Sequence, residues 1–132
     1  RYIWTDGENY YYSYGSDQYV YDKKNKIWLP FKWNGLTNFS GTNIWTDGTN
    51  IYYSAGSEHY YLNNLSKTWA EMSWVNIDDF YGRDIFTDGE NIYVVSMHIY
   101  MLQKDSNNWV RKEWNDIRPM DARGFFYDGI NC

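Results

Sequence analysis

The sequence predicts an all-β protein built from repeated four-stranded units, and three observations lead to this fold class. A motif with an Asp-Gly pair returns about every 41 residues. Each Asp-Gly pair lies between short runs of β-branched and aromatic residues, which is the pattern of a tight β-hairpin. Aromatic residues make up 22% of the 132 residues, although the mean hydropathy is only −0.76. A chain with so many rings to bury is folded rather than disordered.

Two markers keep the same phase along the chain. The hairpin motif reads IWTDG at 3–7, IWTDG at 44–48, IFTDG at 85–89 and FYDG at 126–129. The second marker is a pair of tryptophans five residues apart: Trp28 and Trp33, Trp69 and Trp74, Trp109 and Trp114. Residues 3–43 and 44–84 are identical at 17 of 41 aligned positions. The chain therefore divides into repeat 1 (3–43), repeat 2 (44–84), repeat 3 (85–124), which lacks one residue between Asp88 and Trp109, and the start of repeat 4 (125–132).

Each repeat is expected to form four short strands, as repeat 2 illustrates. Residues 44–46 and 51–54 flank the Asp-Gly turn and are predicted to pair as a hairpin. Residues 60–62 and 68–72 follow as the third and fourth strands, separated by a polar turn. The polar, glycine-bearing residues 76–82 are predicted to be the loop that leads to the next repeat. No window has a helical period that competes with this interpretation.

Four antiparallel strands in a unit of this length are typical of a β-propeller blade, which packs one face on each neighbouring blade. The flat rings of Trp28, Trp69 and Trp109 suit the gap of about 10 Å between packed sheets. A β-trefoil is the alternative, because it closes with three four-stranded units of about this size. The motif at 126–129 favours the propeller, since a closed three-unit fold has no place for a fourth first strand.

The repeats resemble the Kelch repeat over the whole chain. Residues 118–129 run Pro-Met, Arg, a small residue, an apolar stretch and Asp-Gly, and residues 88–95 continue with Asp-Gly and Ile-Tyr-Val. Tyr21-Asp22, followed by Trp28, is similar to the later part of that repeat. The double glycine that ends the second Kelch strand is incomplete here, because residues 13–15, 54–56 and 96–98 carry one glycine or none. The units are therefore identified as divergent Kelch-like blades.

The Kelch resemblance implies a ring of several blades around a central channel. Propellers close with about 4–8 blades, whereas residues 1–132 hold three repeats and one further strand. We therefore expect the single β-repeat domain of residues 1–132 to be part of a larger propeller, either as a fragment of a longer protein or by self-association. The strand that would be redundant in a symmetric ring favours the fragment.

Composition excludes several classes of partner and scaffold. The net charge of −5 and the pI of about 4.8 argue against a nucleic-acid partner, which requires a clustered basic face. The longest apolar runs, such as residues 92–95, are far shorter than the roughly 18 residues of a membrane span. The one cysteine, Cys132, allows no intrachain disulfide. The compartment stays open, with the cytoplasm favoured by the Kelch resemblance and the lack of disulfides.

The sequence contains no constellation that indicates an enzyme, a metal site or a cofactor. His59 and His98 have no histidine or cysteine companion, and a zinc site needs three or four converging ligands. The repeated aspartates precede glycines, so their expected role is to form turns. The pair Asp78-Asp79 occurs in one repeat only, which is weak evidence for acid and base chemistry. We therefore expect a protein without catalytic activity.

The loops that follow the second tryptophan of each repeat differ most between repeats, so they are the predicted binding surface. Arginine and aromatic residues are enriched at binding hot spots. The candidate binding residues are Asn38, Phe39, Asp79, Phe80, Tyr81, Arg83, Arg118 and Arg123. Phe39 and Phe80 match each other, which favours a structural role as plugs between blades over contact with a partner. Arg83 and Arg123 match the Kelch arginine, for which a structural ion pair and a partner contact both stay open.

Two functions are carried forward from the sequence. The first is a non-catalytic Kelch-like module that binds a protein partner through loops at one end of the ring, and this function rests on the resemblance. The alternative is an extracellular glycan-binding or structural repeat domain, in which exposed Trp and Tyr rings stack on sugars. Two tryptophans at fixed phase in every repeat favour a packing role for most of these rings.

Overall fold

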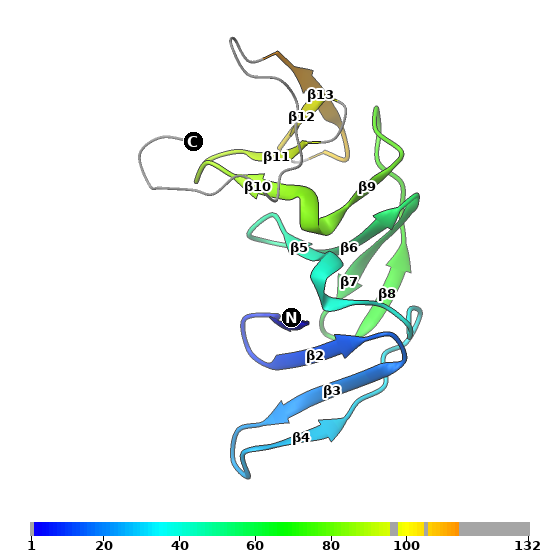
Figure 1. Cartoon of the computed structure of the whole chain (residues 1–132), viewed down its shortest axis with the longest axis vertical. Helices are drawn as coiled ribbons and strands as arrows, with labels where there is room; N and C mark the ends of the chain where they lie inside the picture. Colours follow the sequence, from blue (N-terminus) through cyan, green and yellow to red (C-terminus); the bar gives the residue numbers. More distant parts are fainter. Residues whose placement is uncertain (1, 96–97, 105, 114–132) are drawn as a thin grey trace.

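The computed structural model describes residues 2–95, 98–104 and 106–113. Over these residues the chain forms 13 β-strands and two short 3-10 helices, so the all-β prediction is confirmed. The strands form three sheets, and each sheet is built on an antiparallel meander of four strands in chain order. Figure 1 shows the three sheets following one another along the long axis of the molecule.

Each sheet belongs to one repeat. Sheet 1 contains β1 (Ile3–Thr5), β2 (Tyr10–Tyr14), β3 (Asp17–Asp22) and β4 (Ile27–Pro30). Sheet 2 contains β5 (Ile44–Thr46), β6 (Ile51–Gly56), β7 (Glu58–Asn63), β8 (Thr68–Glu71) and the short β9 (Phe80–Tyr81), which pairs with β6. Sheet 3 contains β10 (Ile85–Thr87), β11 (Ile92–Val95), β12 (Ile99–Leu102) and β13 (Trp109–Lys112). The 3-10 helices η1 (Gly41–Asn43) and η2 (Gly82–Asp84) lead into the next sheet.

The Asp-Gly pair closes the first hairpin of every sheet in the same way. In sheet 1 the carboxylate of Asp6 accepts hydrogen bonds from the backbone N–H groups of Glu8 and Asn9, at 2.9 and 2.7 Å. Gly7 follows with φ of +95°, a left-handed conformation that glycine adopts without steric cost. Asp47 and Asp88 accept the corresponding bonds in the other two sheets. The predicted turn-forming role of these aspartates is therefore confirmed.

The register of the strands locates the residue that repeat 3 lacks. Tyr52 pairs with Tyr61 in sheet 2, whereas the equivalent Tyr93 pairs with Met101 in sheet 3, one residue nearer in sequence. The shortening therefore lies in the connection between β11 and β12, and both later strands keep the common pattern. Among the described strands every ladder joins strands of the same repeat, and the backbone pairing between sheets consists of isolated bridges such as Asn34 to Thr68.

Sheets 1 and 2 pack through a layer of aromatic rings from both repeats. The ring of Phe39 lies 5.5 Å from that of Trp69, and Trp33 lies 5.8 Å from the same indole. Trp4 completes the contact from β1, with its centroid 6.1 Å from Trp69. Burying one such side chain contributes about 1.5–3 kcal/mol, and offset or edge-to-face ring pairs add to it. This layer is the core between the first two sheets.

The same layer returns between sheets 2 and 3, one repeat later. Phe80, Trp74 and Trp45 contact Trp109 with ring centroids 5.4, 5.7 and 6.1 Å apart. Buried aliphatic residues close this core: Ile77, Val94 and Leu102. The predicted packing of tryptophans between sheets therefore holds for Trp69 and Trp109.

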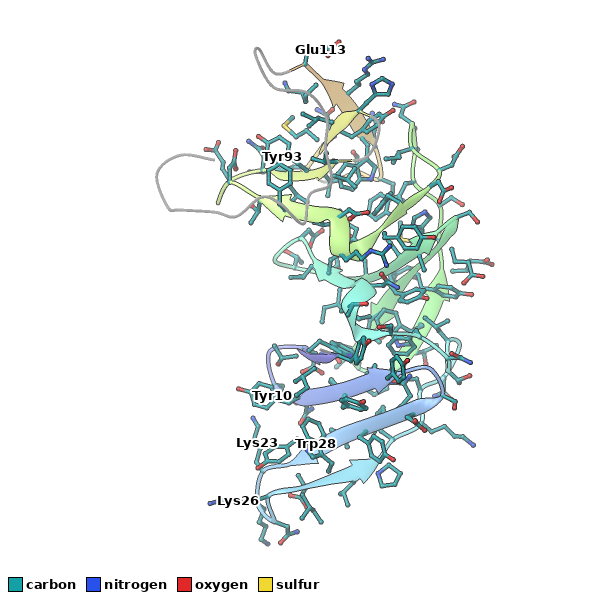
Figure 2. All side chains as sticks on the ribbon, viewed as in Figure 1. Tyr10, Lys23, Lys26, Trp28, Tyr93 and Glu113 are labelled. Atoms are coloured by element: carbon teal, nitrogen blue, oxygen red, sulfur yellow. The ribbon has the colours of Figure 1, made fainter. Side chains whose placement is uncertain are left out.

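Trp28 differs from its two repeat equivalents. Its side chain lies on the outer face of sheet 1 and is 40% exposed, although Trp69 and Trp109 are 2% and 0% exposed. Figure 2 shows Trp28 near the end of the molecule that carries Tyr10, Lys23 and Lys26. Residues 114–124 of repeat 3 and the predicted first strand of repeat 4 at 125–132 lie outside the described residues.

Candidate functional site

The loops that join consecutive sheets lie beside the turns that connect the second and third strands. The backbone N–H of Phe39 donates to the carbonyl oxygen of Gly15 at 3.1 Å, and β9 pairs with the end of β6. These contacts bring six predicted binding residues to one end of the sheets: Asn38, Phe39, Asp79, Phe80, Tyr81 and Arg83. The other two, Arg118 and Arg123, lie outside the described residues.

Phe39 and Phe80 point into the core. Each is 2% exposed and contacts the buried tryptophan of the next sheet. They occupy matching positions one repeat apart, so the two loops are anchored in the same way. Their buried rings hold the loop backbone, and the side chains just before them, Asn38 and Asp79, stay exposed.

A buried polar side chain supports each loop from below, and sequence reasoning assigned no such role to either residue. Gln18 donates through Nε2 to the carbonyl oxygens of Gly15 and Phe39, at 2.8 and 3.3 Å. His59 stands at the same position one repeat later and lies 2.9 Å from the carbonyl oxygen of Asp78. The signal was present in the sequence, since both positions fall on a strand at the same repeat phase and neither is apolar.

The contacts of His59 fix its tautomer. The carbonyl oxygen of Asp78 only accepts, so Nε2 carries the proton and donates to it. Nδ1 of the neutral ring then accepts from the Ser54 hydroxyl at 3.0 Å, while Ser54 Oγ accepts from the Trp45 indole N–H at 3.0 Å. Burial lowers the pKa of His59, so the neutral ring that this chain of bonds requires is favoured at neutral pH. The loop at 78–79 is therefore tied to the core through three side chains.

The exposed part of this end differs between the two loops. The side-chain oxygen of Asn38 lies beside Gly15, and that of Asp79 lies beside Gly56 at the matching place. Repeat 2 adds Tyr81, which is 39% exposed, and the guanidinium of Arg83, 4.5 Å from the centre of that ring. A cation over an aromatic face gains about 0.5–1 kcal/mol at an exposed site. The two loop backbones are held in the same way, but they present different side chains. The first loop exposes an amide, and the second exposes a carboxylate and a Tyr-Arg pair.

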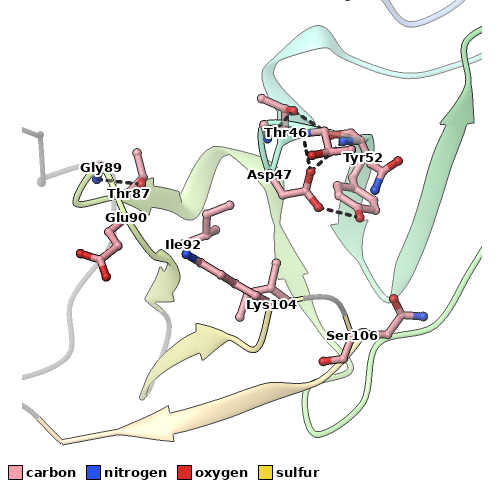
Figure 3. A pocket seen from close by; sticks show the side chains of 14 residues that line it. Thr46, Asp47, Tyr52, Thr87, Gly89, Glu90, Ile92, Lys104 and Ser106 are labelled. Atoms are coloured by element: carbon pink, nitrogen blue, oxygen red, sulfur yellow. Dashed lines mark hydrogen bonds between the residues drawn. The ribbon is translucent and has the colours of Figure 1, made fainter.

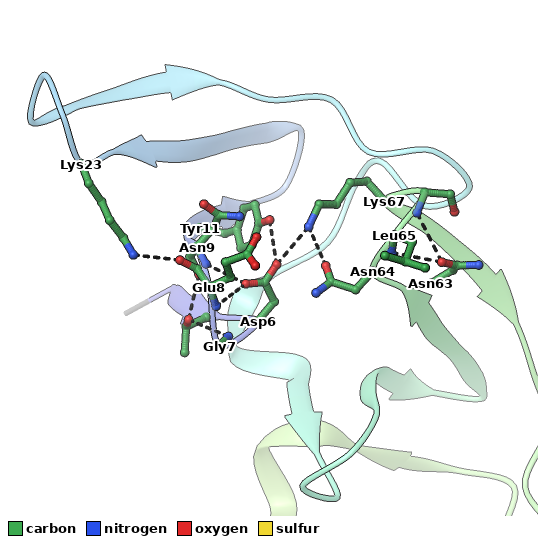
Figure 4. A network of polar contacts seen from close by, with 12 residues as sticks. Asp6, Gly7, Glu8, Asn9, Tyr11, Lys23, Asn63, Asn64, Leu65 and Lys67 are labelled. Atoms are coloured by element: carbon green, nitrogen blue, oxygen red, sulfur yellow. Dashed lines mark hydrogen bonds and ion pairs between the residues drawn. The ribbon is translucent and has the colours of Figure 1, made fainter.

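The opposite end of the sheets carries a polar contact between repeats, shown in Figure 4. Lys67, in the turn between β7 and β8, places its ammonium 3.1 Å from the carboxylate of Asp6. The same carboxylate accepts from the hydroxyl of Tyr11 at 2.9 Å, and Asn64 Oδ1 accepts from Lys67 at 2.6 Å. The Asp6 side chain is fully buried, so the ion pair joins the two repeats away from solvent on the aspartate side.

The corresponding place between sheets 2 and 3 is a pocket of about 640 Å³, drawn in Figure 3. Asn107 stands where repeat 2 has Lys67, and the carboxylate of Asp47 accepts from the hydroxyl of Tyr52 at 3.1 Å. Burial and the neighbouring Asp47 raise the pKa of Tyr52 to about 12, so this hydroxyl stays protonated. Lys104 and Glu90 line the same pocket. The two junctions therefore share their aromatic core and differ in their polar contact.

Replacing Asp6 by asparagine is expected to lower the free energy of unfolding by about 2 kcal/mol at pH 7. Burial raises the pKa of Asp6, but hydrogen bonds from the backbone N–H groups of Asn9 and Glu8 and from Lys67 outweigh it, and the folded pKa is about 2. The ordinary value is 3.8, so the stabilisation is present above about pH 4 and is lost as pH falls towards 2. Urea unfolding at pH 7, 4 and 2 measures the difference between variant and wild type.

The matched control is Asp47→Asn, which removes the same turn contacts where Asn107 stands in place of the lysine. It should cost less than Asp6→Asn at pH 7. An Asp6→Asn deficit that stays the same at pH 2 would contradict the role given to the charged carboxylate.

Groups of three or more His, Cys, Asp or Glu side chains that could hold a metal ion do not occur over residues 2–95, 98–104 and 106–113. Over the same residues no helix is long and apolar enough to cross a membrane.

Comparison with protein-family models finds no match for this chain, and comparison with curated proteins finds none either.

Proposed function

We propose that the chain is a non-catalytic, Kelch-like β-propeller module that binds a protein partner through the loops at one end of its sheets. The propeller arrangement is supported by the sheets themselves, because each described repeat keeps its strand ladders within its own sheet and packs face to face on its neighbour. A closed three-unit barrel, as in a β-trefoil, would instead require hydrogen-bonded strands shared between repeats.

The observation that carries the binding function is the difference between two loops on one scaffold. Phe39 and Phe80 anchor the loops identically, and Gln18 and His59 support them at the same position. The exposed side chains nevertheless change between the loops. Rigid elements that hold variable loops are a common basis for recognition.

The chemistry of the second loop suggests its partner. Tyr81 presents an exposed ring with the Arg83 guanidinium over it, and both residue types are enriched at binding hot spots. Asp78 and Asp79 are exposed in the same loop. A protein surface that offers a carboxylate to Arg83, a flat apolar group to Tyr81 and a basic group to the aspartates fits this arrangement.

Alanine at both Tyr81 and Arg83 is expected to weaken partner binding at least tenfold, because loss of a hot-spot side chain costs more than about 1 kcal/mol. Affinity capture from a cell extract, with wild-type and variant chains compared side by side, identifies the proteins that depend on this loop. Isothermal titration with the captured partner then measures the loss in affinity.

The control is the double alanine variant of Ser40 and Thr42, which occupy the same two positions in the loop of repeat 1. It should retain the partner at nearly the wild-type affinity. Suppose that the Tyr81 and Arg83 variant captured the same proteins as the Ser40 and Thr42 control and bound them with equal affinity. Binding through the loop of repeat 2 would then be refuted.

A glycan-binding role is the second candidate, and one feature of sheet 1 favours it. A shallow hollow of about 310 Å³ is lined by Ile3, Tyr12, Tyr19 and Trp28, whose exposed indole is of the kind that stacks on sugars. A glycan array probed with wild type and Trp28→Ala, together with tryptophan fluorescence on adding the sugars, tests this role. An absence of array hits and of fluorescence change would remove it.

A further inference from the structure

The outer face of sheet 1 is formed by the same four repeat positions that sheets 2 and 3 bury against a neighbour, and three of the four residues are identical in all three repeats. Four positions define this face, here called the docking face: Ile3, Tyr12, Tyr19 and Trp28. Their equivalents in sheet 2 are Ile44, Tyr53, Tyr60 and Trp69, and those in sheet 3 are Ile85, Val94, Tyr100 and Trp109. In sheets 2 and 3 these residues belong to, or pack on, the inter-sheet cores. Trp28 is 40% exposed, and no sheet of the described residues packs against it as sheet 1 packs against Trp69.

Lys26, on the same sheet, stands at the position from which Lys67 pairs with an aspartate of the preceding sheet. Lys26 occupies the position of Lys67 in the turn before the fourth strand, and the two backbones share a left-handed φ of 57° and 56°. Lys67 uses that geometry to reach Asp6, the aspartate of the Asp-Gly turn in the preceding sheet. Over the residues that the structure describes, Lys26 forms no ion pair, and Figure 2 shows it at the tip of the molecule. Lys26 is therefore placed to meet an aspartate of the same kind.

The backbone of the fourth strand gives a third, independent match. In sheet 2 the N–H of Trp69 donates to the carbonyl of Asn34 at 2.8 Å, and the N–H of Asn34 donates to the carbonyl of Lys67 at 3.3 Å. Val75 bridges Trp109 and Asn107 in the same way in sheet 3, at 3.0 and 2.7 Å. Within the described ranges no loop bridges the N–H of Trp28 and the carbonyl of Lys26.

We propose that the docking face is an interface for a further repeat of the same kind, and this proposal goes beyond the loop-mediated function. The occupant is a four-stranded sheet with its own equivalents of Trp4, Trp33 and Phe39. It also supplies an Asp-Gly turn for Lys26 and a loop backbone for Trp28. The preceding repeat supplies the aromatic layer and the loop backbone at both junctions within the chain, and it supplies an aspartate to a lysine at the junction of sheets 1 and 2. A sheet of other chemistry would leave at least one of the three contacts unmade.

A second copy of the chain is a poorer occupant than a further repeat. The complementary faces of sheets 1 and 2 are already covered by the sheets that follow them. On sheet 3 the equivalent side chains, Phe86 and Tyr93, are 8% and 7% exposed. Over the described residues, the aromatic side chains of all three complementary faces are therefore buried rather than exposed to another molecule.

The test is an extended chain in which a copy of residues 44–84 is joined directly to residue 3, so that Ile3 follows Asp84 as Ile85 does. The probe is oxidation of tryptophan by N-bromosuccinimide, followed by peptide mapping of Trp28. We expect Trp28 to react at least tenfold more slowly in the extended chain than in the original chain, and at a rate near that of Trp69. A glycine-serine extension of the same length is the control and should leave the rate unchanged.

The variant Lys26→Ala makes the test specific. It should leave the urea midpoint of the original chain unchanged and lower that of the extended chain, because only there does Lys26 meet an aspartate. Equal oxidation rates in the original and extended chains would overturn the proposal. So would a dimer of the original chain in sedimentation velocity that protects Trp28, which would make a second copy the occupant, or a glycan that protects Trp28 in the original chain.

Discussion

Trp69→Ala is expected to lower the free energy of unfolding by about 3–5 kcal/mol, the usual cost of truncating a buried tryptophan. The indole is 2% exposed and packs on Trp33, Phe39 and Trp4 of the other sheet. Its loss leaves a cavity in the layer that joins sheets 1 and 2, and the surrounding rings cannot close it without moving both sheets. Chemical denaturation monitored by circular dichroism measures the change.

Trp28→Ala is the matched control, because Trp28 has the same place in its repeat and is 40% exposed. It should cost about 1 kcal/mol, as expected for a residue that loses only partial burial. If Trp69→Ala does not unfold the chain outright, the difference between the two variants isolates the inter-sheet contact. Equal losses for the two variants would contradict the packing of sheet 2 on sheet 1.

Gly82→Ala is expected to cost about 3 kcal/mol, the upper end of the range for overpacking a close contact. A Cβ at this position would fall on the carbonyl oxygen of Asn43 and lie 3.0 Å from Cδ1 of Trp45. Both neighbours are held in the core, so relief requires η2 to move away from sheet 2. The thermal midpoint and the urea midpoint of the variant measure the effect.

Gly48→Ala serves as the comparison for this substitution. Gly48 has φ of +96° and open space around its Cα, so alanine there suffers backbone strain without a clash. A loss of about 1 kcal/mol is expected from the strain alone. If Gly82→Ala proved no more harmful than Gly48→Ala, the close approach of η2 to sheet 2 would be contradicted.

The fold was largely predictable because the repeat period and the turn chemistry are local. The Asp-Gly pairs specify hairpins through contacts within a few residues, so the strands could be placed from sequence alone. The tryptophans at constant phase indicated a layer between sheets, and Trp69 and Trp109 occupy it. Trp28 stands at the same repeat position, but its burial would require a sheet packed on the outer face of sheet 1. The repeat pattern does not say whether such a sheet is present.

The candidate site was less predictable because its supports cross between distant parts of the chain. Phe39 and Phe80 were named as binding candidates and also as plugs between blades, and their rings lie in the core while Tyr81 and Arg83 stay exposed. From the sequence, His59 was assigned no structural role, whereas its side chain is buried and donates to the carbonyl oxygen of Asp78. Lys67 meets Asp6 across 61 residues, a contact that depends on how two sheets face each other.

The face-to-face succession of the three repeats is tested most directly by nuclear Overhauser effects between aromatic side chains in solution. We expect cross-peaks from Phe39 to Trp69 and from Phe80 to Trp109, whose ring centroids are 5.5 and 5.4 Å apart. Trp28 should show cross-peaks to Tyr21, 5.1 Å away in its own sheet, and to neither of the other two tryptophans of its position. Mutual cross-peaks among Trp28, Trp69 and Trp109 would place the same position of all three repeats in one shared core, as in a β-trefoil, and would contradict the stacked sheets.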